Sequence, residues 1–176
     1  RMEFKSAFAS IERDGMGFAI VGQASAEYGG RLAMKGNYYI DPQLLDITGT
    51  FENYKLHNMS TMNARFALAE DLDLDLEVKG TFDAKLKMVD RRAVIEKIGL
   101  SVDSGSGRVF IPYKVFNSYT VHNIEMDVAL YQPNEIRLNK LKVVIGSEGP
   151  TVNFSGKGFL QEKSQSSFKG TIAIDK

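Results

Sequence analysis

The sequence predicts an all-β protein: one antiparallel, strongly curved sheet with a single short helix. Apolar residues recur at every second position along most of the 176 residues, which is the period of a strand with one buried face. Turn signals separate the alternating runs at short intervals, and short connections join antiparallel neighbours rather than parallel strands. Such a sheet can curl into a half-pipe or open groove, or alternatively close as a sandwich or barrel.

The clearest alternating run is Leu72–Lys79, where leucines and a valine alternate with acidic residues and a lysine. Similar runs extend from Phe18 to Ile174. Because successive side chains of a strand point to opposite faces, each run predicts one apolar and one polar face. The positions expected to line the apolar face are Phe18, Ile20, Leu32, Met34, Tyr38, Ile40, Leu74, Leu76, Phe82, Leu86, Leu100, Ile124, Met126, Val128, Leu130, Leu138, Val143 and Phe154.

Glycine and proline mark the turns between these runs. Asp14-Gly15-Met16-Gly17, Asp41-Pro42-Gln43 and Ser147-Glu148-Gly149-Pro150 predict tight turns, because glycine permits positive φ and proline presets a turn φ. Asp103-Ser104-Gly105-Ser106-Gly107 is interpreted as a hairpin loop. The apolar parity changes between Leu138 and Leu141, which predicts a β-bulge near Asn139 and Lys140.

One segment has helical spacing. Met59, Met62, Phe66 and Ala69 are three, four and three residues apart, which places them on one face of a helix. This helix either covers the core or acts as a lid over an apolar cavity, with Met59, Met62 and Phe66 facing the sheet. Arg92–Lys97 fits either a helical turn or a strand, and a strand is preferred.

A weak internal repeat places glycine inside the strands. Gly36, Gly49, Gly80 and Gly170 each stand between polar residues, two positions before a large apolar residue. Glycine weakens a strand, so its recurrence indicates either a bend or the close approach of another group to the backbone. Chance similarity among strand ends is the alternative.

Charge and composition exclude several classes of protein. The 22 basic and 22 acidic residues balance, which argues against nucleic acid as a partner, since phosphate binding needs an excess of Lys and Arg. Cysteine is absent, so the chain has no disulfide framework and no thiolate site. No apolar run reaches the 18 residues that a membrane-spanning helix needs. A chain that begins at Arg1 with an immediate strand pattern is interpreted as one β-domain, residues 1–176, cut from a longer protein.

The residues that usually carry chemistry form no recognisable site. His57 is expected in a loop and His122 on an outward strand position, without the spacing of a metal site or a catalytic triad. Asp71, Asp73 and Asp75 begin like a calcium loop, but Leu76 replaces the required glycine. We therefore expect neither catalytic activity nor a metal ion or other cofactor.

The order of strands and turns resembles a family of bacterial envelope proteins. The segments that carry the resemblance are Ile98–Asp103, Gly107–Pro112, Val121–Tyr131, Ile136–Leu141 and Val152–Gly156, together with the upstream Leu45-Asp46-Ile47-Thr48-Gly49 strand. Together they are similar to the AsmA-like proteins, especially the YhdP-like branch related to TamB. The resemblance covers most of the chain, although its motifs are loose β-patterns.

This resemblance implies a function as well as a fold. AsmA-like proteins are large Gram-negative envelope proteins with an N-terminal inner-membrane helix and a long periplasmic β-groove that is thought to pass phospholipid between the membranes. By resemblance, the apolar face would contact phospholipid or another acyl-chain ligand, and flanking repeats of the parent protein would be partners. The parent would be anchored in the inner membrane by a helix outside this segment. The alternative is a structural or adhesive β-module with a closed core and no ligand, and a dispersed enzyme site is the least favoured.

The two outermost predicted strands lie near Phe4–Ile11 and Phe168–Ile174. In the parent protein they would pair with flanking repeats. In the isolated chain they would expose unpaired backbone groups, so we expect edge-to-edge association that rises with concentration.

Overall fold

The computed structural model consists of antiparallel strands in a single sheet, which confirms the predicted fold class. The structure describes residues 4–26, 29–57, 73–90, 92–110, 119–131, 134–159 and 167–175. Its strands are β1 (Phe4–Asp14), β2 (Gly17–Ala26), β3 (Arg31–Tyr39), β4 (Leu44–His57), β5 (Asp73–Val89), β6 (Arg92–Phe110), β7 (Tyr119–Tyr131), β8 (Glu135–Ile145), β9 (Thr151–Phe159) and β10 (Ser167–Asp175). The helix expected around Met59, Met62 and Phe66 lies outside the described residues.

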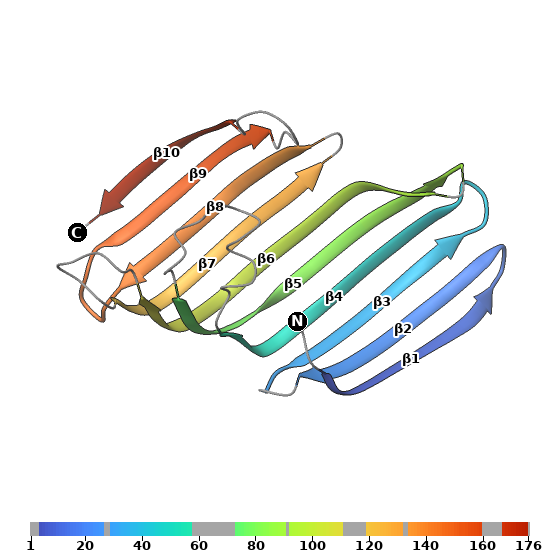
Figure 1. Cartoon of the computed structure of the whole chain (residues 1–176), viewed down its shortest axis with the longest axis horizontal. Coiled ribbons are helices and arrows are strands. Elements are labelled where there is room, and N and C mark those ends of the chain that lie inside the picture. Colours follow the sequence, from blue (N-terminus) through green and yellow to red (C-terminus); the bar gives the residue numbers. More distant parts are fainter. Residues whose placement is uncertain are drawn as a thin grey trace.

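The strands lie side by side in chain order, from β1 at one edge to β10 at the other (Figure 1). Every neighbouring pair is antiparallel. Since β1 and β10 do not pair, the sheet formed by the described residues is open, and it is not a closed sandwich or barrel. No helix in this described part is long and apolar enough to cross a membrane.

The tight turns predicted at Asp14–Gly17, Asp41–Gln43 and Ser147–Pro150 form. Gly15 has a positive φ in the β1–β2 turn, and the Asp41–Pro42 peptide is cis in the turn before β4. Arg92–Lys97 belongs to β6, which confirms the preference for a strand. Ile40 lies in the turn after β3 and is exposed, so its expected place on a strand face is wrong. His57 ends β4 opposite Asp75, and the expected loop there is also wrong.

The hairpin loop expected at Asp103–Gly107 does not form. These residues continue β6, which runs unbroken to Phe110. Gly105 and Gly107 pair with Val78 and Leu76 of the neighbouring strand β5. A Cβ on Gly105 would lie 2.7 Å from the Val78 side chain. Gly105 therefore makes room for neighbouring side chains, and Gly107, with a positive φ, for the Asp75 backbone, within a long strand that does not reverse here.

Bulges interrupt the ladder in the central and C-terminal strands. One extra residue enters β6 at Asp103 and β7 at His122, and β4 shifts register between Phe51 and Tyr54. The bulge predicted near Asn139 and Lys140 is confirmed by the shift between Leu138 and Leu141. Bulges bend strands and increase their twist, and the long strands β4 to β6 curve visibly along their length (Figure 1).

The buried core lies close to the bulges of β4, β6 and β7. It consists of Phe51, Leu76, Val78, Val102 and Val121, with partly buried neighbours around it. The apolar side chains of the two outermost strands are the most open, since Ile11 on β1 and Ile172 on β10 are about two thirds exposed to solvent. The sheet thus has a packed centre and open flanks.

Candidate functional site: an exposed apolar face

The strand register brings apolar residues from all ten strands into continuous rows across one side of the sheet. Three adjacent rows define what we call the apolar face. The first contains Ile11, Ile20, Gly36, Ile47, Ala84, Ile98, Leu130, Ile136, Gly158 and Phe168. The second contains Ala9, Gly22, Met34, Gly49, Phe82, Leu100, Val128, Leu138, Gly156 and Gly170, and the third Ala7, Ala24, Leu32, Phe51, Gly80, Val102, Met126, Leu141, Phe154 and Ile172.

The rows extend well beyond the length of a lipid chain. Neighbouring strands are about 4.8 Å apart, so nine spacings give roughly 43 Å from β1 to β10. One leaflet of a bilayer holds acyl chains in about 15 Å, half of its hydrocarbon core. An extended apolar ligand could therefore occupy several successive positions along the rows.

Large side chains on this face are open to solvent. They include Ile11, Phe18, Ile98, Leu100, Phe168 and Ile172. Contiguous exposed apolar surface is unusual on soluble proteins and marks binding sites for protein, membrane or ligand. Within the described part of the chain, no second layer covers these side chains.

Aromatic rings lie over strand glycines on the same face. The ring of Phe82 occupies the space above Gly49, and the ring of Phe51 approaches within 2.7 Å of where a Cβ of Gly80 would stand. Near the other edge, the Phe154 ring approaches Gly170, and the rings of Phe154 and Phe168 have centroids 5.5 Å apart. The repeated glycines thus accept neighbouring side chains, as one interpretation of the sequence repeat proposed.

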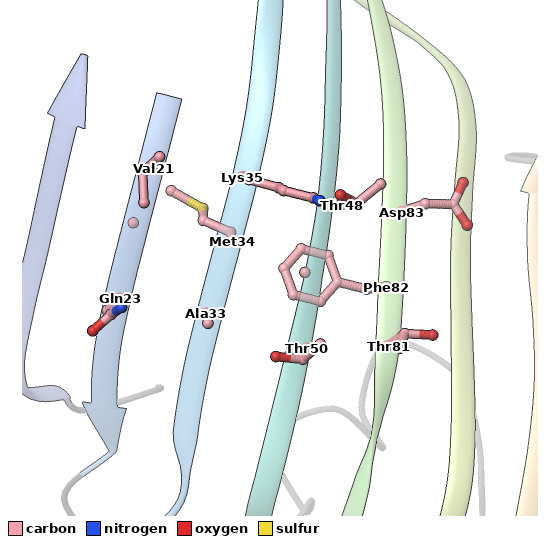
Figure 2. Close-up of a pocket in the computed structure, with 12 residues that line it drawn as sticks. Val21, Gln23, Ala33, Met34, Lys35, Thr48, Thr50, Thr81, Phe82 and Asp83 are labelled. Atoms are coloured by element: carbon pink, nitrogen blue, oxygen red, sulfur yellow. The ribbon is translucent and has the colours of Figure 1, made fainter. Parts of the chain in front are cut away.

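A shallow depression of about 450 Å³ lies across β2 to β5 (Figure 2). Its lining consists of three consecutive residues from each strand, which are Val21–Gln23, Ala33–Lys35, Thr48–Thr50 and Thr81–Asp83. Figure 2 shows the Phe82 ring over β4 and the Met34 side chain directed toward β2. In each trio the middle residue belongs to the second apolar row, whereas the flanking residues, which include Val21, Lys35 and Asp83, belong by register to the opposite side of the sheet.

The opposite side of the sheet is mainly polar and carries the ion pairs. Lys85 pairs with Asp46 at 3.6 Å across β4 and β5, and Glu125 pairs with both Lys140 and Lys142 across β7 and β8. The hydrogen bond from Lys140 holds the pKa of Glu125 below its ordinary value. We call this side the polar face, although Phe8, Val21 and Phe159 also lie on it.

A smaller polar depression of about 310 Å³ lies beside the bulges. Asn53, Glu77, Lys79, Ser104, Ser106, His122 and Asn123 contribute to its lining. His122 is exposed on the bulge of β7, in agreement with the expected outward position. Among the described residues, no group of three or more His, Asp or Glu side chains is placed to hold a metal ion.

Most of the residues expected from the sequence do share the apolar face. The register aligns Phe18, Ile20, Leu32, Met34, Tyr38, Leu76, Phe82, Leu86, Leu100, Ile124, Met126, Val128, Leu130, Leu138, Val143 and Phe154. Leu74 belongs to β5, but its side chain is outside the described set. Ile11, Phe168 and Ile172 were not among the expected lining positions, although strands were predicted near Phe4–Ile11 and Phe168–Ile174.

Comparison with known proteins leaves the family open. No family model matches the chain, and neither a curated protein nor a solved structure matches it.

Proposed function

We propose that this chain is a segment of a lipid-transfer path along which phospholipid acyl chains slide on the apolar face. The observation that supports it is the set of continuous apolar rows that cross all ten strands, with large side chains open to solvent on β1, β2, β6 and β10. Each buried methylene contributes about 0.8 kcal/mol, so even partial contact would hold an acyl chain. Because successive rows are similarly apolar, a bound chain meets little change in free energy as it moves.

The proposal places phospholipid headgroups in water or beside polar side chains and requires neither a cofactor nor a catalytic group. Following the resemblance to AsmA-like proteins, we propose that the parent protein acts in the periplasm of a Gram-negative bacterium. It would be anchored in the inner membrane and move phospholipid toward the outer membrane. A closed structural module is less well supported, since the described strands expose the surface that such a module would bury.

The decisive test compares one substitution on the two faces. Leu100 lies on the apolar face and is 36% exposed, whereas Val21 lies on the polar face and is 46% exposed. Leu100→Asp introduces a charge into the proposed acyl path, and Val21→Asp introduces the same charge outside it. Both chains are purified from a Gram-negative host, and the retained phospholipid is quantified by mass spectrometry.

We expect the native chain and Val21→Asp to retain phospholipid and Leu100→Asp to lose most of it while remaining folded. A photoreactive amino acid at Ile98 should crosslink to a phospholipid in vesicles, and the same probe at Val21 should not. Equal retention by both variants, or crosslinking from Val21 alone, would remove the apolar face from any lipid path.

A further inference from the structure

The two edges of the described sheet both present backbone groups without a strand partner and exposed isoleucine side chains. Among the described strands, β1 and β10 each pair on one side only, which leaves a row of backbone N–H and C=O groups without a strand partner at each edge. Next to these groups, Ile11 on β1 and Ile172 and Ile174 on β10 are each about two thirds exposed. An exposed edge of this kind is a template for pairing with another strand.

The strand count determines which pairing a second molecule can make. Nine successive antiparallel pairings leave β1 and β10 running in opposite directions. A second copy in the same orientation, moved along the sheet, therefore brings its β1 antiparallel to β10. The apolar and polar faces then continue from one copy to the next.

We infer that β10 of one chain pairs with β1 of a second copy, in the register that sets Lys169 opposite Glu12. In this register Gly170 lies opposite Ile11, and Ile172 lies opposite Ala9. Ile11 and Ile172 thus each meet a small residue, as Phe82 meets Gly49 within the sheet, and Phe168 lies opposite Arg13. On the polar face, Thr171 lies opposite Ser10.

Charge supports this register. Lys169 lies directly opposite Lys157 within its own sheet, and like charges in that position destabilise a strand pair. Among the described residues, no carboxylate forms an ion pair with Lys169 and no cation forms one with Glu12. The second copy places Glu12 opposite Lys169, with Asp14 at the end of the same strand.

The absence of native cysteine permits a direct test by disulfide trapping. Ser10→Cys and Thr171→Cys chains with tags of different mass are mixed and oxidised. Opposed residues of paired strands have Cα atoms about 4.5–5.5 Å apart, which a disulfide spans. We expect mixed dimers between the two chains, and far fewer when Glu12→Cys replaces Ser10→Cys, since that position is displaced by two residues.

A second experiment tests the charges by sedimentation of the 176-residue chains. Glu12→Lys and Lys169→Glu should each raise the dissociation constant for self-association roughly three- to tenfold, because an attraction becomes a repulsion. The double variant Glu12→Lys with Lys169→Glu should associate like the native chain. Three results would each overturn the inference. They are disulfides formed only between identical variants, a native chain that stays monomeric at high concentration, and a double variant whose self-association is as weak as that of the single variants.

Discussion

Leu100 and Val102 lie two residues apart on β6 and point to the same apolar face, yet they differ sharply in exposure. Val102 is 6% exposed and belongs to the core, whereas Leu100 is 36% exposed. If the apolar face is open in solution, an aspartate should be severely destabilising at Val102 and tolerated at Leu100. This difference tests the openness of the sheet without any ligand.

The expected magnitudes follow from the two exposures. At Val102 an unpaired carboxylate would be buried, at a cost of about 4 kcal/mol or more, which approaches the whole stability of an ordinary domain, about 5–15 kcal/mol. Leu100 has about two thirds of its side chain buried, and complete burial of leucine contributes about 1.5–3 kcal/mol. Leu100→Asp should therefore cost roughly 1–2 kcal/mol, because its carboxylate can reach water.

Urea denaturation followed by far-ultraviolet circular dichroism measures both values, at low protein concentration to limit association through the edges. We expect Val102→Asp to be largely unfolded without urea and Leu100→Asp to unfold cooperatively at a reduced midpoint. Val102→Ala, which removes only methyl groups, serves as the control for packing. Equal and severe destabilisation by both aspartates would show that Leu100 is covered in solution and would refute the open face.

The remaining predictions concern the glycines and the ion pairs. Gly22→Ala should change the urea midpoint little, because a Cβ there meets the flexible Met34 side chain, whereas Gly80→Ala should lower it clearly, because a Cβ there meets the Ser101 backbone. Lys140 lowers the pKa of Glu125 in the folded state. The ionised Glu125 carboxylate therefore stabilises the folded protein above the ordinary glutamate pKa, and this stabilisation is lost as pH falls through the pKa of Glu125 in the folded state. Glu125→Gln should therefore flatten the acid side of the stability profile measured by thermal unfolding, and an unchanged profile would contradict that role for the ion pair.

The local alternation of apolar and polar residues was sufficient to predict much of the fold. Alternation with a period of two identified the strands and sorted most of their residues correctly between faces, because strand geometry itself imposes that period. The parity change after Leu138 located the bulge at Asn139 for the same reason. Where the pattern contained glycine and serine, at Asp103–Gly107, composition suggested a turn, yet both glycines pair with β5, Gly105 opposite Val78 and Gly107 opposite Leu76.

The sequence by itself determined that the chain forms amphipathic antiparallel strands with β1 and β10 outermost, because alternation and turn chemistry are properties of a few neighbouring residues. Only the tertiary structure decided that the sheet formed by the described strands stays open and that its ten apolar strand faces align into continuous rows. It also decided that burial is deepest near the bulges at Phe51–Tyr54, Asp103 and His122. These outcomes depend on register and twist summed over nine strand pairings, and an open and a closed sheet require the same alternation along each strand.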